Sequence, residues 1–98
     1  MKMKQGDLVT VLTNAGEFIG RLDSDDEKGV TLSNPKMIVN TPEGKMGFAR
    51  GVCLTGVENT KIVQFRSGGI VLVTPCNPDI NKAYTEVVSG IVIEKSFS

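Results

Sequence analysis

The chain has 98 residues, of which 40% are hydrophobic and 22% are charged. This composition is ordinary for a globular protein, and the length suits one domain, residues 1–98, near the lower limit for a self-sufficient core. Eleven basic and eleven acidic residues cancel, which excludes an overall electrostatic attraction to nucleic acid or to acidic membranes.

Two cysteines, Cys53 and Cys76, show no metal-ligand spacing, and the chain contains no histidine. We therefore expect neither a zinc site nor any other cofactor, and reduced thiols of this kind are typical of cytosolic proteins. The opening residues, MKMKQGD, lack an apolar export segment, and no stretch reaches transmembrane length. We expect a cytoplasmic protein without a membrane partner.

Apolar residues alternate along the first third of the chain, with a period of two that is typical of strands with one core-facing side. Turns at Asn14-Ala15-Gly16 and over residues 23–29 are too short for anything but antiparallel pairing. We therefore predict a strongly bent antiparallel meander, the beginning of a small barrel. The alternating residues are Val9 and Val11, then Phe18, Gly20 and Leu22, then Val30 and Leu32.

The middle of the chain is less regular. Asn34-Pro35 predicts a bend or bulge within the third strand, because proline cannot donate a ladder hydrogen bond. Residues 37–41 resume an extended pattern, and Pro42-Glu43-Gly44 predicts a turn. Residues 45–54 then read as a returning strand, and residues 57–60 as a loop.

A strand pattern covers residues 61–65, followed by a tight turn over residues 66–69 and a strand over residues 70–74. The last strand is apolar at four successive positions, which is typical of burial on both faces. No lysine, proline or inward charge protects its edge, and an unprotected apolar edge is an aggregation hazard. We therefore expect another copy of the chain to pair with Ile70, Val71, Leu72 and Val73.

Such a contact between one subunit's last strand and its neighbour's fourth is heterologous, and it closes into a ring when the rotation permits. The alternative is coverage of this edge within the protomer, by the following helix or by a short terminal strand at residues 91–93.

In residues 75–98 the apolar side chains recur with the period of a helix, instead of the period of two that is typical of strands. Residues 78–89 are predicted as an amphipathic helix, with Asn77 as N-cap, Pro78 at the first position and Gly90 at the stop. Residues 94–98 are expected to fray. The apolar stripe of the helix should pack on the barrel of residues 1–74; it consists of Ile80, Ala83, Tyr84, Val87 and Val88.

These motifs resemble those of the Sm/Sm-like (LSm/Hfq-type) family of ring-forming, RNA-binding barrels. The first Sm motif is matched by Val9, Val11, Gly16, Phe18, Gly20, Leu22, Asp25 and Leu32, and the second by residues 65–73; residues 49–51 are a rival placement of the second motif. The order of a final strand, a Pro-containing segment and a helix over residues 75–91 is similar to small Sm-like proteins of tailed phages, including cyanophages. The resemblance implies an all-β fold, a small five-stranded Sm-like (SH3-type) barrel with a C-terminal helix.

The resemblance also implies a homo-oligomeric ring whose pore-facing turns bind single-stranded RNA or DNA. Arg66, Ser67 and Gly68 would hold phosphate or base, with Asp25 and Lys28 opposite them. An arginine at a glycine-rich turn can bind phosphate with two hydrogen bonds or stack on a base. The alternative for Arg66 is a solvated hairpin residue, with Gly68-Gly69 present only to supply positive φ. The alternative for the acidic turn is a solvated hairpin turn, because residues 23–28 lack the calcium-loop pattern that a cation site would need.

The chain departs from the family at Glu27, which occupies the base-stacking position, and at Gly29, where the family has Asn. Together with the zero net charge, these differences favour an alternative function, a phage structural or assembly protein that uses the ring as a protein-interaction scaffold. The order of the motifs favours nucleic-acid binding. An enzyme is not expected, because the chain has no histidine to act as general base and neither cysteine has an activating partner.

Overall fold

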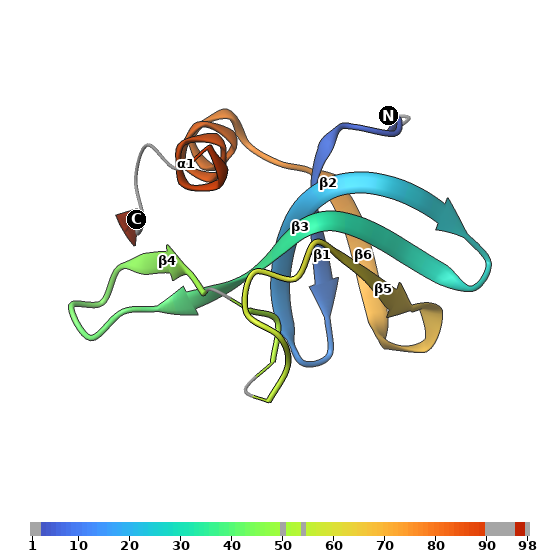
Figure 1. Ribbon diagram of the computed structural model, residues 1–98, viewed down its shortest axis with the longest axis horizontal. Coiled ribbons are helices and arrows are strands. Elements are labelled where there is room, and N and C mark those ends of the chain that lie inside the picture. The colour runs from blue at the N-terminus through green and yellow to red at the C-terminus, as the bar shows by residue number, and fades with distance from the viewer. Residues whose placement is uncertain (1–2, 50, 54, 90–95, 98) are drawn as a thin grey trace.

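The structure is a computed structural model that describes residues 3–49, 51–53, 55–89 and 96–97. The fold is mainly antiparallel β with one helix near the C-terminus, as the sequence predicts (Figure 1). In chain order the elements are β1 (Leu8–Thr13), β2 (Gly16–Asp26), β3 (Gly29–Asn40), β4 (Met46–Phe48), β5 (Ile62–Arg66), the 3-10 helix η1 (Ser67–Gly69), β6 (Ile70–Pro75), α1 (Pro78–Val88) and β7 (Ser96–Phe97).

The strands are arranged in the order β6-β1-β2-β3-β4-β7, and β5 also pairs with β3. β3 pairs with β2 and, because it is long and kinked, with two further strands: its first half pairs with β5 and its second half pairs with β4. The predicted bend is confirmed at Asn34, which has a φ of +48°, and at Pro35, which is fully buried. Beyond the kink, the hairpin of β3 and β4 projects from the rest of the sheet (Figure 1).

Both predicted hairpins are confirmed, and both turns are tight. Asn14 and Ala15 link β1 to β2, where the Thr13 hydroxyl donates to the Gly16 carbonyl at 2.9 Å. β2 runs further than the sequence predicts, so that only two residues link it to β3. The Asp26 carboxylate accepts a hydrogen bond from the Lys28 amide at 2.8 Å, which gives this amide of the turn a hydrogen-bond partner.

The alternating residues predicted to face a core are buried, and so is Ile19 on the opposite side of β2. One cluster gathers Val9, Val11, Leu22, Val30 and Leu32 inside the curved sheet. A second cluster forms around Leu8, Ile19 and Tyr84, where α1 covers the other face. The sheet therefore buries apolar side chains on both faces, because the helix adds a second layer.

Helix α1 begins where the sequence predicts and ends at Val88, with Ser89 as its C-cap. The Asn77 side chain accepts a hydrogen bond from the Ile80 amide at 2.9 Å, as expected of an N-cap. The stripe packs in part as predicted: Ala83 and Tyr84 are buried, whereas Val88 remains 40% exposed. The expected stop at Gly90 and the strand at residues 91–93 lie outside the described residues.

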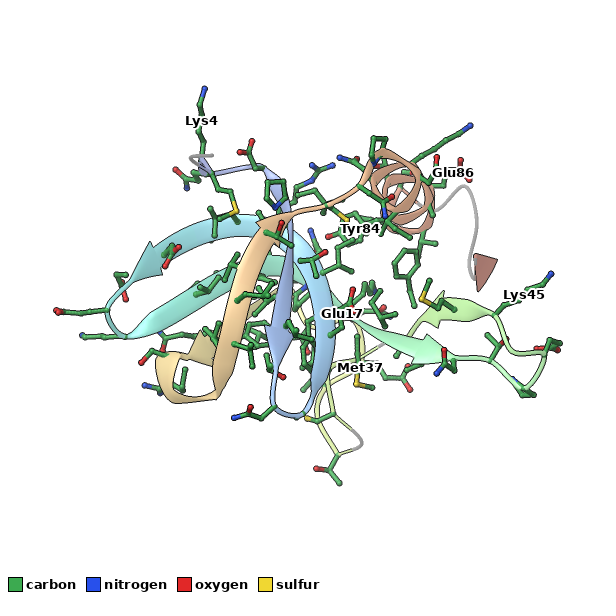
Figure 2. The ribbon with its side chains drawn as sticks, turned by 180° about the vertical axis from the view of Figure 1, so that it is seen from behind. Lys4, Glu17, Met37, Lys45, Tyr84 and Glu86 are labelled. Carbon is green, nitrogen blue, oxygen red and sulfur yellow. The ribbon has the colours of Figure 1, made fainter. Side chains whose placement is uncertain are left out.

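Tyr84 is the main anchor of α1, on the side of the helix that faces the sheet (Figure 2). Its hydroxyl donates to the Asn34 carbonyl at 2.7 Å, and its ring meets Phe48 edge to face at 6.2 Å. The Arg21 guanidinium lies 5.9 Å from the centre of the ring. The helix is thus fixed to the kink of β3.

The predicted returning strand over residues 45–54 is confirmed only in part, because among the described residues of this range only Met46–Phe48 form a strand, β4. The Ala49 amide donates to the Met37 carbonyl at 2.8 Å, and strand pairing with β3 ends there. Gly51 and Gly56 interrupt the apolar pattern that a longer strand would need. Lys36 holds the far end of the loop, since its ammonium donates to the Asn59 side chain at 2.8 Å.

Two further expectations need correction. The strand at residues 70–73 is not buried on both faces of the protomer, since Val71 is 59% and Leu72 46% exposed, because nothing in the described residues covers the outer side of β6. The C-terminal residues do not all fray: β7 pairs with β4, at Met46 with Phe97 and at Gly47 with Ser96. No helix in the described part of the chain is long and apolar enough to cross a bilayer.

Replacing Gly29 with alanine should lower the free energy of unfolding by about 3 kcal/mol, as expected for overpacking combined with a backbone that alanine disfavours. A Cβ at this position would overlap the Phe65 carbonyl oxygen, and φ is +147°. Urea unfolding measures the loss. Gly69→Ala is the matched control, because its Cβ meets nothing within 4 Å; equal stabilities for the two variants would contradict the prediction.

Tyr84 is the single tyrosine of the chain, so its ultraviolet absorbance can be titrated alone. Burial raises its pKa to about 12 from 10.0, against a smaller opposing effect of Arg21. The folded protein should therefore form tyrosinate near pH 12 and the urea-unfolded protein near pH 10. Because the folded state holds this proton more tightly, stability should fall between these two pH values, and Tyr84→Phe should abolish that contribution. Coincident titrations would contradict the burial.

Candidate nucleic-acid interface

The short helix η1 lies between the two hairpin turns at one end of the sheet. The Ser67 amide donates to the Lys28 carbonyl at 3.1 Å, on the β2–β3 turn. The Asn14 amide, on the β1–β2 turn, donates to the Gly69 carbonyl at 3.0 Å. These two hydrogen bonds hold η1 in place between the turns.

The five residues that the sequence marks as a candidate site come from the β2–β3 turn and from the β5–η1 connection. These segments lie side by side, because Gly29 pairs with Arg66 across the β3–β5 ladder (Figure 1). All five residues are exposed: Asp25, Lys28, Arg66, Ser67 and Gly68. The structure thus brings them to one end of the molecule, although not into one pocket.

An acidic hollow of about 190 Å³ lies on one side of η1. Asp25, Asp26 and Ser67 supply its polar wall. We call this the acidic hollow, and its remaining lining consists of Gly29, Val30, Ile70 and Val73. Asp23 and Glu27 lie in the same segment of β2 and its turn. The surface around the acidic hollow therefore carries an excess of negative charge.

An aromatic hollow of about 230 Å³ lies on the other side of η1. Its floor contains Phe18 and Phe65, whose ring centres are 4.9 Å apart at an interplanar angle of 55°. We call this the aromatic hollow, and it is lined by Thr13, Ala15, Phe18, Phe65, Arg66, Gly69 and Ile70. Arg66 is the one charged residue among these seven.

Of the predicted site residues, Asp25 and Ser67 line the acidic hollow and Arg66 lines the aromatic hollow, and Ile70 is shared between the two hollows. Sequence reasoning missed Phe18 and Phe65 as site residues. Phe65 directly precedes Arg66, which is a usable signal. Phe18 pairs with Met37 on β3 whereas Phe65 pairs with Val30, so the curvature of the sheet rather than the strand pairing brings the two rings together.

Two strand edges are open beside this end. Within the described residues, β6 pairs with β1 alone and β5 pairs with β3 alone. The exposed large apolar side chains of these strands are Ile62 on β5, with Val71 and Leu72 on β6. Ile70 and Val73 instead pack partly against the inner core.

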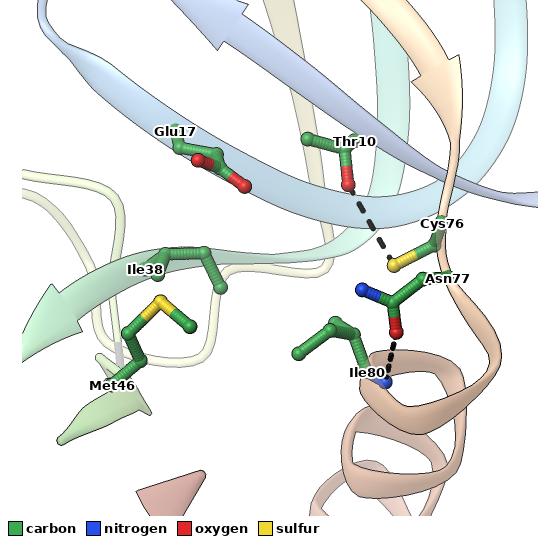
Figure 3. A pocket seen from close by; sticks show the side chains of 7 residues that line it. All are labelled: Thr10, Glu17, Ile38, Met46, Cys76, Asn77 and Ile80. Carbon is green, nitrogen blue, oxygen red and sulfur yellow. Dashed lines mark hydrogen bonds between the residues drawn. The ribbon is translucent and has the colours of Figure 1, made fainter. Parts of the chain in front are cut away.

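A smaller cavity of about 110 Å³ lies under the start of α1 (Figure 3). Thr10, Glu17, Ile38, Met46, Cys76, Asn77 and Ile80 line it. The Thr10 hydroxyl donates to the Cys76 sulfur at 3.6 Å, and burial is the main cause that raises the pKa of the Cys76 thiol. Across the described ranges, no three His, Cys, Asp or Glu side chains gather in a way that could hold a metal ion.

No protein-family model matches this chain, and no curated protein matches it at a significant level.

The two thiols should differ in reactivity towards an alkylating reagent at mildly alkaline pH. Cys53 is exposed, whereas Cys76 is half-buried with a raised pKa, and the thiolate is the reactive form. Intact-mass measurements on Cys53→Ser and Cys76→Ser variants should show that Cys53 reacts at least about tenfold faster. Equal rates would contradict the packing of Cys76 under α1.

Proposed function

We propose that this protein is a non-enzymatic Sm-like protein with an SH3-type barrel, which forms a cyclic homo-oligomer and binds single-stranded nucleic acid. The observation that carries the proposal is the pair of open edges beside η1. One edge belongs to β5 and exposes Ile62, and the other belongs to β6 and exposes Val71 and Leu72.

The two edges support a ring rather than a two-fold dimer. They are different strands, so pairing β6 of one copy with β5 of the next leaves a free β5 and a free β6 at the two ends of the pair. Such head-to-tail contacts repeat until the ring closes. The pairing would satisfy the unpaired backbone groups of both strands, which removes the hazard of open edges, and would give their exposed apolar side chains cross-strand neighbours.

The end around η1 supports nucleic-acid binding. Arg66 is exposed and lines the aromatic hollow, which no carboxylate lines. Asp26 lies two strands away in the same row of the sheet, because both residues pair with Gly29. A guanidinium there can reach a phosphate without competition from carboxylates in the same hollow. Binding of a flexible strand to several copies of this end around a ring would also gain from multivalency.

The acidic hollow favours a second candidate function, in which the ring is a scaffold for other proteins, as in a phage structural or assembly component. Asp25 and Asp26 line this hollow beside Ile70 and Val73. A surface that joins carboxylates to apolar residues suits a basic protein segment better than a polyanion.

Val71→Lys should convert the assembly to monomers of 10.5 kDa, because a lysine on an edge strand opposes pairing with another strand. Multi-angle light scattering measures the mass. Val57→Lys is the matched control, since Val57 is 75% exposed but lies in the loop between β4 and β5 rather than in either edge strand. An assembly of unchanged mass in Val71→Lys would remove this edge from the proposal.

Arg66→Ala should weaken binding of a single-stranded oligonucleotide and leave the assembly mass unchanged. If Arg66 contacts one phosphate, the log–log dependence of affinity on salt should lose about one unit of slope per bound copy. Fluorescence anisotropy over a salt series measures both quantities. Failure of the unmodified protein to bind any single strand at low salt would leave only the scaffold function.

A further inference from the structure

We infer that the aromatic hollow is a base-binding subsite that accepts a nucleobase of a single strand without distinguishing its identity, with the adjoining phosphate on Arg66. The inference rests on the proposed nucleic-acid function and specifies its ligand. It concerns a surface on the β1–β2 side of η1, formed by residues that the pattern of the sequence assigns to the core.

The shape and lining of the hollow favour a flat apolar body. Phe65 is half-buried and Ile70 is half-buried, so both retain surface towards the hollow. Phe18 packs beneath them against the Phe65 ring at 4.9 Å. Nucleobases stack on aromatic and apolar side chains of this kind, and such stacking tolerates every base because each has a flat π face.

The charge beside the aromatic hollow indicates that a ligand of the hollow carries an anionic group. Arg66 is the charged residue of the lining, and Asp25 and Asp26 line the opposite hollow. An apolar pocket beside one guanidinium fits a ligand with a flat apolar part and an anionic part close to it. A nucleotide unit of a single strand has both parts, whereas an apolar peptide side chain has no anionic part.

The polar groups of the hollow predict a lack of base selectivity. Thr13 supplies its one side-chain hydroxyl, and that hydroxyl is occupied: it donates to the Gly16 carbonyl at 2.9 Å. It also accepts from the Ala15 and Gly16 amides, each at 3.1 Å. The side chains of the floor therefore offer no free hydrogen-bonding partner to the edge of a base, and edge contacts are what distinguish bases.

The test compares three single strands of equal length: oligouridylate, oligoadenylate and a strand of abasic sugar-phosphate units. The two base-bearing strands should bind with similar affinity and at least about tenfold more tightly than the abasic strand, in line with the usual contribution of stacking. The abasic strand should retain the salt-dependent binding that phosphate contacts provide.

Ala15→Leu tests the location. Ala15 is exposed at the rim of the hollow, so a larger side chain should fill the space without disturbing the core. This variant should bring the affinity for oligouridylate down to that for the abasic strand. Asn14→Leu is the matched control, because Asn14 is exposed in the same turn but does not line the hollow.

The outcomes distinguish a failure of the base-binding subsite from a failure of the nucleic-acid function. If the abasic strand binds as tightly as oligouridylate, or if Ala15→Leu binds oligouridylate normally, the subsite is overturned and the nucleic-acid function stands. If no strand binds, the nucleic-acid function fails and the subsite fails with it. A preference for one base over the other greater than about tenfold would overturn the absence of selectivity.

Discussion

Three residues of 3-10 helix separate β5 from β6, and this short link is the constraint on which the rest of the structure depends. η1 is bonded on one side to Lys28 and on the other to Asn14. The strands that leave it pair with different partners, β5 with β3 and β6 with β1. They follow each other in the chain without pairing, and each keeps an open edge. A protomer that kept both apolar edges open would be prone to aggregation, which is why the proposed function begins with assembly.

The same link divides the end of the molecule into two chemically different halves. Asp25 and Asp26 line one hollow, and the two phenylalanines with Arg66 line the other. Overall neutrality therefore conceals a local separation of charge. The electrostatic potential near Arg66 is governed by nearby groups, since exposed charges more than a Debye length of about 8 Å away are largely screened at physiological salt.

Local patterns were sufficient to predict much of the fold. Alternation marked β1, β2 and the start of β3, Asn34-Pro35 marked the kink, and Asn77-Pro78 marked the beginning of α1. These features depend on neighbours in the chain. The length of β4 and the pairing of β7 were not predicted, because a strand of two or three residues is determined by its partner rather than by its own pattern.

The candidate site was predicted only in part, because some of its contacts join residues that are far apart in the chain. The proximity of Lys28 to Ser67 follows from two turns whose residues are recognisable in the sequence. The contact of Phe18 with Phe65 depends on the curvature of the whole sheet, because their partners on β3, Met37 and Val30, are far apart along that strand. Likewise, the hydrogen bond from Tyr84 to the Asn34 carbonyl joins residues separated by 50 positions, and no local signal indicates it.

Amide hydrogen exchange tests the central claim most directly, because it reports whether the outer edges of β5 and β6 are paired in solution. About half of the amides in a strand point to each side, so the amides of β6 that do not face β1 should exchange slowly at high protein concentration. Dilution that dissociates the assembly should release them, together with the outward amides of β5, while the amides of the β1–β2 ladder stay protected. Rapid exchange of the outer β5 and β6 amides at every concentration would contradict the account.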